Sequence, residues 1–369
     1  MKTVLSVFGT RPEAIKMAPV LKSLAGERDI RSLTCVTAQH REMLDQVLSL
    51  FSIRPDEDLD LMRDGQSLAE ITTRALTELE GHLARVKPDL LLVQGDTTTT
   101  MAASIAAFYA RVPVGHIEAG LRTGNPGYPF PEEVNRRITS VLARHHFAPT
   151  ERARRNLLAE GVADDCIVVT GNTVIDALLD VVGMKPSRAP KLPLRGIRMV
   201  LVTAHRRENF GPPLLEITGA IRDLAGSYPD VDLVYPVHRN PNVDRPVRKE
   251  LSHVPGVHLI DPLEYKAFAD LMAESYLILT DSGGIQEEAP SLGKPVLVLR
   301  DETERPEAVE AGTVKLVGPH RAAIVSAAKE LLDSKDAYAS MARAVNPYGD
   351  GKASGRIVGR IRAALGLYR

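Results

Sequence analysis

The sequence predicts an α/β protein with two Rossmann-like domains, each built on a doubly wound parallel sheet. With 369 residues, the chain is too long for one compact core and suits two domains. Short apolar runs alternate with longer helical patterns, and this alternation implies parallel strands joined by right-handed crossovers. The alternation stops over residues 183–196, which are rich in Pro, Lys and Arg, and then starts again. We therefore expect an N-terminal domain over residues 1–182 and a C-terminal domain over residues 197–353.

The composition is that of a soluble globular protein, and we expect the protein in the cytoplasm. Hydrophobic residues make up 44% of the chain and charged residues 25%. The formal net charge of -1 gives no overall attraction to nucleic acid or to an anionic membrane, so any anion site has to be built locally. Neither of the 2 cysteines lies in a metal-ligand pattern, so we expect reduced thiols. We expect no signal peptide and no membrane span, because no apolar run is long enough.

The first half alternates strands and helices from its first residues. Pro12 and Glu13 suit the first turn of a helix that follows the first strand. The strands are expected at 3–8, 32–37, 89–94 and 112–117, with short ones near His146 and Ile167. The helices are expected after Pro12, through Met43 to Leu48, at 68–84, at 101–109, from Glu132, and at 171–182.

The second half repeats the alternation. Its strands are expected at 198–203, 232–235, 257–260, 276–279, 295–299 and 314–317, with helices between them. The last helix, 354–367, carries apolar residues on one face, which indicates that it docks on another part of the chain.

The stretch T-D-S-G-G-I-Q-E-E-A-P, residues 280–290, indicates a phosphate site. It follows an apolar strand, and Gly283 and Gly284 make a tight turn that lets the backbone approach a ligand. Ser282 is placed to cap the helix that starts there, whose N–H groups and positive dipole end favour an anion. Glu288 lies about one helical turn further on, within reach of a ribose. The alternative is an ordinary strand–turn–helix corner.

Two arginines precede prolines that begin helices. Arg11 lies in T-R-P-E-A-I and Arg305 in E-R-P-E-A-V. Shared helix-start chemistry explains the Pro and Glu of both segments. It does not explain the arginines, because a cation at a helix N-terminus opposes the dipole, whereas a bound anion would reverse that cost.

Several polar residues follow strands and are expected at one edge of the sheets, where open parallel sheets bind ligands. Glu132 comes from a loop that enters a helix near the same edge. For each carboxylate the alternative is a helix cap or a solvated charge, and Asp96, which precedes four threonines, is the most ambiguous. The residues expected at this edge are Asp96, Glu118, His205, Ser282 and Arg305.

The histidines do not form a metal motif. His205 and His238 each end a strand, and either one is read equally well as a functional group or as a histidine bonded to the backbone. Their spacing is not that of metal ligands, and no G-x-G-x-x-G follows a strand. We therefore expect no metal and no nicotinamide or flavin cofactor.

Ten motifs together resemble the non-hydrolysing UDP-N-acetylglucosamine 2-epimerase family of bacteria and archaea, over nearly the whole chain. The first half carries F-G-T-R-P-E-A-I-K-M-A-P from Phe8, T-A-Q-H-R-E-M-L-D from Thr37, G-D-T-T-T-T from Gly95, H-I-E-A-G-L-R from His116 and P-E-E-V-N-R from Pro131. The second carries A-H-R-R-E-N, Y-P-V-H-R-N-P-N-V, T-D-S-G-G-I-Q-E-E-A-P-S-L-G-K-P, E-R-P-E-A and N-P-Y-G-D-G.

The resemblance implies the GT-B arrangement, with two domains facing a cleft and the final helix, 354–369, completing the first domain. It also implies a homodimer that interconverts UDP-GlcNAc and UDP-ManNAc for cell-envelope polysaccharide synthesis. UDP would leave to give 2-acetamidoglucal and then add back after protonation on the other face of C2. We expect the two domains to close on the substrate.

The resemblance also assigns roles to residues. Asp96, Glu118 and Glu132 match the acid–base set, and His205 is grouped with them as a catalytic residue that also touches the diphosphate. The residues that match substrate contacts are Arg11, Lys16, Phe268, Ser282, Gly283, Gly284, Glu288 and Arg305. Gln39, Arg206 and His238 match a regulatory UDP-GlcNAc site that Glu132 borders. Glu42 and Gly65 differ from the Gln and Arg that some relatives carry there.

Three other functions fit the same motifs. The first is epimerisation of a related UDP-sugar, such as a 2,3-diacetamido uronic acid. The second is a retaining glycosyltransferase, which would need an acceptor. The third is a UDP-sugar binding protein without catalysis.

Overall fold

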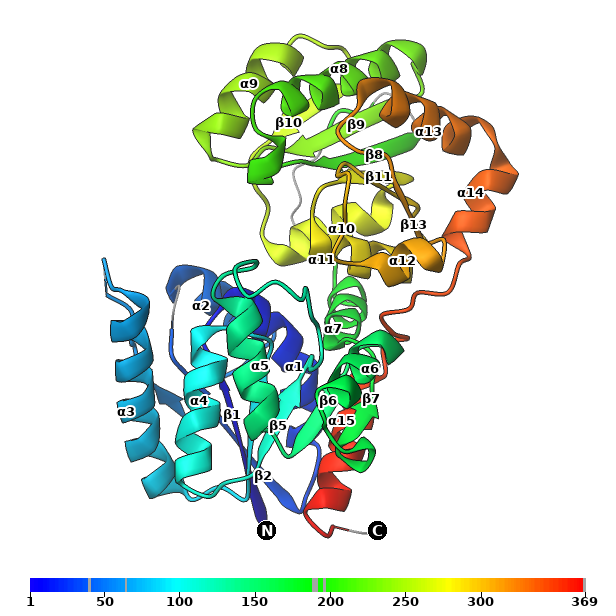
Figure 1. Cartoon of the computed structure of the whole chain (residues 1–369). Coiled ribbons are helices and arrows are strands. Elements are labelled where there is room, and N and C mark those ends of the chain that lie inside the picture. The colour runs from blue at the N-terminus through cyan, green and yellow to red at the C-terminus, as the bar shows by residue number, and fades with distance from the viewer. Residues whose placement is uncertain (39–40, 64, 188–191, 195–196, 368–369) are drawn as a thin grey trace. The chain divides into compact units, whose positions relative to one another are not determined.

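The computed structural model describes residues 1–38, 41–63, 65–187, 192–194 and 197–367. The chain forms two compact units (Figure 1). Unit 1 consists of Met1–Asp180 and Tyr348–Arg369, and unit 2 consists of Val181–Pro347. Within the described ranges, no helix is both long and apolar enough to cross a membrane. Gln39, one of the residues matched to a regulatory site, lies outside the described residues.

Unit 1 is built on a seven-stranded sheet in which every paired strand is parallel. The strand order is β3-β2-β1-β4-β5-β6-β7, so the order reverses between β1 and β4. The strands are β1 Lys2–Phe8, β2 Ile30–Val36, β3 Glu57–Asp58, β4 Leu90–Gln94, β5 Val114–Ile117, β6 His145–Ala148 and β7 Ile167–Val169.

The helices of unit 1 cover both faces of its sheet. Helices α3, α4 and α5 pack side by side, whereas α1 packs against α2 and against α15, the last helix of the chain. The core under α3 and α4 is made by alternate strand residues such as Leu5 and Val7 together with the small residues of α4. The helices are α1 Arg11–Ala25, α2 Arg41–Leu50, α3 Leu68–Val86, α4 Thr98–Tyr109, α5 Glu132–Leu142, α6 Glu151–Ala159, α7 Thr173–Val182 and α15 Ala353–Ala364.

Unit 2 repeats the plan with a six-stranded parallel sheet. Its order, β10-β9-β8-β11-β12-β13, reverses between β8 and β11. Apolar residues of these strands and of the helices α8, α9 and α13 form a core cluster on one face. The strands are β8 Arg198–Thr203, β9 Val231–Pro236, β10 Val257–Ile260, β11 Leu277–Thr280, β12 Val296–Val298 and β13 Val314–Leu316. The helices are α8 Pro212–Ser227, α9 Pro241–Leu251, α10 Tyr265–Glu274, α11 Gly283–Glu288, α12 Pro306–Glu310, α13 Arg321–Asp333 and α14 Lys335–Ala342.

The two parallel α/β sheets predicted from the sequence are confirmed, and most strand bounds shift by only one or two residues. The strands expected at 198–203 and 257–260 have those bounds. One helix start was wrong: α4 begins at Thr98 rather than at residue 101, because the Thr97 hydroxyl accepts from the Thr100 amide and caps the helix. In α1, Arg11 occupies the first helical position, and Pro12 follows it.

Close approach of two loops requires a glycine at the end of β1. A Cβ on Gly9 would lie 2.1 Å from the Thr37 hydroxyl oxygen and 2.9 Å from that of Thr99. These two hydroxyls are hydrogen-bonded to each other at 2.9 Å. The turn that leads into α1 is therefore pressed against the loop after β2 and the start of α4.

Candidate active site

In unit 1 the predicted residues gather where the strand order reverses. Arg11 follows β1, Asp96 follows β4, and Glu118 follows β5, so all three lie at the carboxyl ends of adjacent strands. In open parallel sheets a ligand binds outside this edge. The fold therefore brings Asp96 and Glu118 to one edge, as the sequence predicts, and Arg11 lies at the same edge.

Glu118 is held by donors from three elements. Lys16 Nζ of α1 lies 2.5 Å from Glu118 Oε1, and Asn172 Nδ2 donates to the same oxygen at 2.9 Å. Gln94 Nε2, at the end of β4, donates to Oε2 at 2.5 Å. The backbone of Glu118 has a φ of 66°, which a residue with a Cβ adopts only at a cost of roughly 1 kcal/mol or more. The carboxylate is thus fixed in place, and strain at such an edge residue is typical of functional sites.

Asp96 has an environment that favours its protonated form. Burial, which outweighs the nearby Arg136 guanidinium, raises the pKa of Asp96 to about 6, and the carboxylates of Glu118 and Glu132 add to the increase. Arg136 Nη2 lies 2.5 Å from Asp96 Oδ2, and Asn135 Nδ2 donates to the Asp96 carbonyl at 3.0 Å. A carboxyl with a pKa near neutrality can take up and give back a proton.

The alternative that Asp96 only caps a helix is wrong, because Thr97 provides the cap of α4. The Asp96 side chain is paired instead with Arg136 of α5. Glu132 is the first residue of α5 and lies close enough for its charge to act on Asp96. The neighbouring Glu133, which is buried, binds the amides of Thr123 and Gly124 and so fixes the loop before α5.

Lys16 and Arg11 complete the basic side of this edge. Lys16 pairs with Glu118, so its ammonium lies within the carboxylate cluster. Arg11 is half-buried and has no acidic ion-pair partner among the residues that the structure covers. The geometry leaves the Arg11 guanidinium able to bind an anionic group.

A buried histidine supports the turn that carries Asp96. His116 Nε2 donates to the Gly95 carbonyl at 2.7 Å, and the ring is fully buried. Burial lowers the pKa of His116 to about 3, so the ring is neutral at pH 7. His116 therefore acts on the site through the backbone of the Gly95–Asp96 turn.

In unit 2 the predicted residues also lie where the strand order reverses. His205 and Arg206 follow β8, and Ser282 follows β11. Asp281, fully buried, joins the two loops: its Oδ2 accepts from the amides of His205 and Arg206, each at 2.8 Å, and from Asn209 Nδ2 at 3.0 Å. This buried carboxylate fixes the position of the His205 backbone relative to the turn before α11.

The start of α11 is surrounded by cations. A Cβ on Gly283 would lie 3.6 Å from Arg206 Nη2 and 3.9 Å from the Arg305 guanidinium. Ser282 occupies the cap position, but its side chain makes no capping bond, contrary to the sequence expectation. The hydroxyl of Ser282, the amides of the two glycines and the two guanidinium groups make a site suited to a diphosphate.

Glu288 lies one turn into α11, as expected. Its Oε1 would be 3.5 Å from a Cβ on Gly284, and its Oε2 accepts from the Tyr265 hydroxyl at 3.3 Å. Tyr265 begins α10, which also carries the half-buried Phe268. The structure therefore places Glu288 beside the glycine turn, and the hydroxyl of Tyr265 orients one of its carboxylate oxygens.

Arg305 does not need an anion to explain it. Its Nε is bonded to Glu287, which is buried, so an internal carboxylate offsets the charge at the start of α12. A bound anion is therefore not required to explain Arg305, although its guanidinium lies near Gly283 and can still contact one.

His205 and His238 lie together. Their rings are stacked, with centroids 5.4 Å apart and planes inclined by 13°. Burial lowers the pKa of His205, and the neighbouring Asp281 opposes that effect. His205 is therefore neutral near pH 7 and can donate or accept a hydrogen bond. His238 is exposed, and its Nδ1 accepts from the Asn240 amide at 3.1 Å.

Several residues that hold the site together were not predicted from the sequence. They are buried or half-buried polar side chains behind the predicted ones, and a single sequence gives only weak signals for them, such as an Asp or Asn shortly after a strand. No group of three or more metal-binding side chains occurs among residues whose positions are described. The missed residues are Glu13, Gln94, Arg136, Asn172, Asp281 and Glu287.

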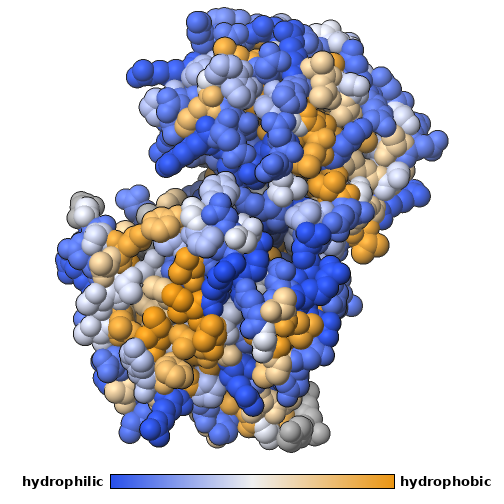
Figure 2. Space-filling view, in the orientation of Figure 1, coloured by the Kyte–Doolittle hydropathy of each residue, from blue (hydrophilic) through white to orange (hydrophobic). Residues whose placement is uncertain are grey.

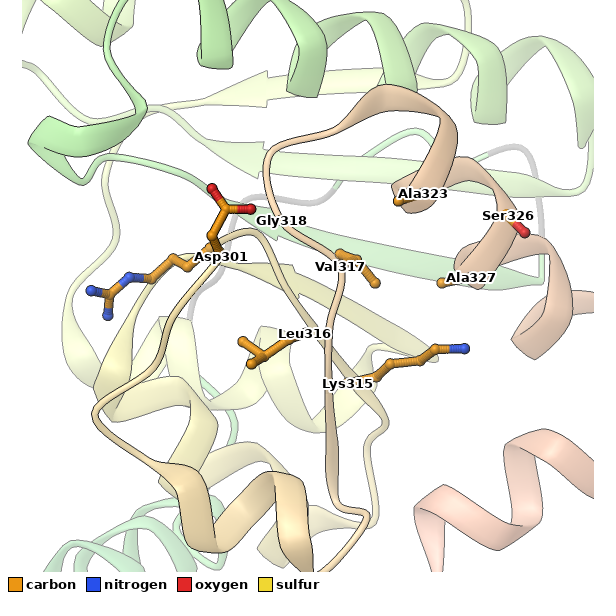
Figure 3. Close-up of a pocket in the computed structure, with 9 residues that line it drawn as sticks. Asp301, Lys315, Leu316, Val317, Gly318, Ala323, Ser326 and Ala327 are labelled. Carbon is orange, nitrogen blue, oxygen red and sulfur yellow. The ribbon is translucent and has the colours of Figure 1, made fainter.

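A cavity of about 410 Å³ lies elsewhere in unit 2, between β13 and α13 (Figure 3). Figure 3 shows that Leu316 and Val317 line one side of the cavity and that Ala323, Ser326 and Ala327 of α13 line the other. None of the residues predicted from the sequence to form the site lines this cavity. Its mixed lining offers no converging set of charged or nucleophilic groups.

The chain is similar in sequence to known UDP-N-acetylglucosamine 2-epimerases. A family model described as UDP-N-acetylglucosamine 2-epimerase matches residues 22–362. The chain is 58% identical to the UDP-N-acetylglucosamine 2-epimerase of Escherichia coli K12 over 364 residues, which is 96% of this chain and 97% of that protein.

Solved structures show the same likeness. The crystal structure of UDP-GlcNAc 2-epimerase from Neisseria meningitidis bound to UDP-GlcNAc matches with a TM-score of 0.88 and 55% identity, over 98% of this chain and 100% of that one. The S. aureus MnaA–UDP structure matches with a TM-score of 0.87 and 51% identity, over 100% of this chain and 98% of that one.

Proposed function

The chain belongs to the UDP-N-acetylglucosamine 2-epimerase family, and we propose that it interconverts UDP-GlcNAc and UDP-ManNAc. The observation that carries the proposal is the cluster at the sheet edge of unit 1. There Asp96 and Glu118 lie within each other's electrostatic influence, and Lys16 pairs with Glu118. Inversion at a carbon by proton transfer needs a base and an acid, and two carboxyl groups in different environments can supply them.

The reaction inverts C2 of the sugar by elimination and re-addition. A carboxylate takes the proton from C2, the C1–O bond breaks with its electron pair leaving on UDP, and a C1=C2 bond forms. UDP oxygen then attacks C1 while a second acid delivers a proton to the opposite face of C2. Breaking the C1–O bond with the proton transfer is what makes this proton acidic, because no carbonyl lies next to C2.

The two carboxyl groups differ in the way this chemistry requires. Three donors stabilise the ionised form of Glu118, and we assign it the role of a base. Asp96, with its pKa raised to about 6, holds a proton more readily, and we assign it to the other face of C2. Glu132 at the start of α5 raises the pKa of Asp96 through its charge, or relays protons between Asp96 and solvent.

Unit 2 is proposed to bind the UDP part. The Ser282 hydroxyl, the amides of Gly283 and Gly284 and the guanidinium groups of Arg206 and Arg305 bind the diphosphate, and Glu288 binds the ribose hydroxyls. His205 donates to the leaving phosphate oxygen in its neutral form. Phe268 of α10, also in unit 2, packs against the nucleotide. Arg11, in unit 1, is proposed to bind an anionic group. No metal or cofactor enters the proposal.

Proton NMR of UDP-GlcNAc with the purified protein in deuterium oxide tests the proposal. We expect UDP-ManNAc to appear without any acceptor, with deuterium at C2 of the product. Binding of UDP without exchange would identify a silent binding protein. Turnover that depends on an added acceptor would identify a glycosyltransferase, and a panel of UDP-sugars would identify another epimerase.

The acid–base assignment is tested by the isosteric amides Asp96→Asn, Glu118→Gln and Glu132→Gln. Each should fold and should slow epimerisation on the order of a hundredfold or more. A variant that has lost reprotonation but retains elimination should release UDP and 2-acetamidoglucal. Full activity in any one variant would remove that residue from the mechanism.

We also propose that the protein is a homodimer that associates through unit 1. Figure 2 shows apolar residues gathered on the face of α4 and α5. On these helices Phe108, Tyr109 and Val141 are 58%, 66% and 84% exposed. Such a patch is unusual on a monomer, and a two-fold axis would let the same patch on a second copy cover it.

A further inference from the structure

We propose that Asn172 is a positioning residue for Glu118, which links the site to the segment where the chain returns to unit 1. This inference rests on the proposed function, because Glu118 is assigned there as the base. Asn172 lies just before α7 and is only 2% exposed. Its Nδ2 lies 2.9 Å from Glu118 Oε1.

The orientation of the Asn172 amide is determined by its other contact. Its Oδ1 lies 3.1 Å from the Val174 backbone nitrogen, which can only donate. The atom facing Val174 must therefore be the oxygen, and the atom facing Glu118 must be the NH₂ group. Asn172 thus caps the first turn of α7 with one atom and donates to the carboxylate with the other.

The backbone of Asn172 is held by the returning chain. Its amide donates to the Tyr348 carbonyl at 2.6 Å. Gly171, with a φ of 86°, lies so close that a Cβ would be 3.2 Å from Gly349 Cα. Tyr348 is the first residue of the returning segment and is 1% exposed. Docking of this segment therefore fixes the donor that faces Glu118.

This contact helps to set both the charge state and the orientation of Glu118. Lys16 and Asn172 donate to Oε1, whereas Gln94 donates to Oε2, so both carboxylate oxygens are oriented by donors. Hydrogen bonds to the ionised form favour that form. Other charged or titratable groups that interact with Glu118 include Asp96 after β4 and the buried, neutral His116 of β5. Removal of the Asn172 donor should therefore make the carboxylate easier to protonate.

The variant Asn172→Asp separates the two roles of the side chain. Aspartate keeps an oxygen for the Val174 amide but replaces the donor with an acceptor that repels the Glu118 carboxylate. We expect kcat to fall by about tenfold or more at pH 7 with UDP affinity unchanged. The acid limb of the kcat profile should move to higher pH by about one unit, because the ionised base has lost a donor.

The double variant Asn172→Asp with Glu118→Gln gives the deciding comparison. In it the glutamine amide introduced at position 118 can donate to the aspartate introduced at position 172, so the pair is restored with donor and acceptor exchanged. If Asn172 acts through Glu118, the double variant should be no slower than Glu118→Gln alone and more heat-stable than Asn172→Asp. A purely structural role of Asn172 predicts instead that the losses of rate in the two single variants multiply in the double variant. That result would overturn the proposal.

Asp176→Asn is the matched control on the same helix. Asp176 accepts from the amides of Ala353 and Ser354, so it holds the same returning segment without touching Glu118. We expect lower thermal stability and an unshifted pH profile. The same shift in Asp176→Asn as in Asn172→Asp would contradict a specific role for the amide.

A readout that does not depend on turnover separates failure of this inference from failure of the proposed function. The carbon-13 carboxyl signal of Glu118, assigned with Glu118→Gln, can be titrated in wild type and in Asn172→Asp. We expect a higher midpoint in the variant. An identical midpoint overturns the role of Asn172, whereas absence of epimerisation by the wild type overturns the proposed function and leaves this titration interpretable.

Discussion

At the scale of single residues, the site depends on giving similar carboxyl groups different surroundings. Asp96 is half-buried beside two other acidic residues and one arginine, and its partial burial raises its pKa to about 6. Glu118 has a lysine and two amides donating to it. The same chemical group therefore serves as a proton donor in one place and as a proton acceptor in the other.

The raised pKa of Asp96 predicts a pH-dependent cost to stability. The folded state binds this proton more tightly than the unfolded state, so ionisation between pH 4 and pH 6 destabilises the wild type but not Asp96→Asn. The free energy of unfolding of Asp96→Asn, relative to that of the wild type, should therefore rise by up to about 3 kcal/mol between pH 4 and pH 7. Denaturant unfolding at several pH values measures this.

Asp89→Asn is the control with the opposite sign. The hydrogen bond from Lys2 lowers the pKa of Asp89, so its stabilising effect grows as pH rises and is lost in acid. The free energy of unfolding of Asp89→Asn should therefore decrease relative to that of the wild type as pH increases. Parallel curves for Asp96→Asn and wild type would show that Asp96 is not perturbed.

Glu288 is predicted to contribute to binding rather than to chemistry. A ribose contact far from C2 is nearly equal in the ground and transition states, so Glu288→Ala should raise KM and the Kd for UDP at least tenfold with a small change in kcat. Steady-state kinetics and calorimetry with UDP measure both. Glu274→Ala, at the exposed end of α10, should change neither. A large fall in kcat at unchanged KM would contradict the ribose assignment.

At the scale of elements, the helix starts do more than begin helices. Both α1 and α3 open with a capping box, made by Thr10 with Glu13 and by Ser67 with Glu70. In α1 the glutamate is 2% exposed and also accepts from the hydroxyls of Thr97 at 2.7 Å and Thr100 at 3.2 Å. One carboxylate thus ties the turn that carries Arg11 to the turn that carries Asp96.

We expect the same substitution, glutamate to glutamine, to lower the free energy of unfolding by different amounts in the two capping boxes. Glu13→Gln replaces an acceptor with a donor that faces buried N–H and O–H groups, so it should lower the free energy of unfolding by about 2 to 4 kcal/mol. Glu70→Gln, whose carboxylate is exposed, should have a much smaller effect. Denaturant unfolding followed by circular dichroism compares them. Equal losses would mean that the link between the two turns is unimportant.

At the scale of the whole molecule, the proposed homodimer follows from an apolar surface that the fold of unit 1 leaves uncovered. Phe108 and Val141 contribute to this surface from neighbouring helices. Replacing both with aspartate should convert the dimer to a monomer, because each charge would be buried without a partner. Analytical ultracentrifugation measures the mass. Val345→Asp, equally exposed in unit 2, should leave the mass unchanged, and a wild-type monomer would refute the proposal.

Much of the fold could be predicted because its signals are local. Apolar runs, glycine turns and helix starts lie within a few residues of each other, so the strands and the positions of Asp96, Glu118, His205 and Ser282 at strand ends could be read in order. The parallel sheets then follow from the alternation. The helix start was predicted wrongly where two local signals competed, at the four threonines, because Thr97 caps α4 and the helix begins at Thr98 rather than at residue 101.

Local patterns along the chain are enough to predict the two parallel sheets, the strand ends that carry the chemistry, and the likeness to one family. The surroundings of each group become visible only in the folded chain, where Glu287 offsets Arg305, Asp281 joins the two loops of unit 2, and Asn172 reaches Glu118. The difference arises because strand and helix formation depend on neighbours along the chain. Hydrogen bonds and pKa values depend on side chains that are tens of residues apart and meet only in the folded sheet.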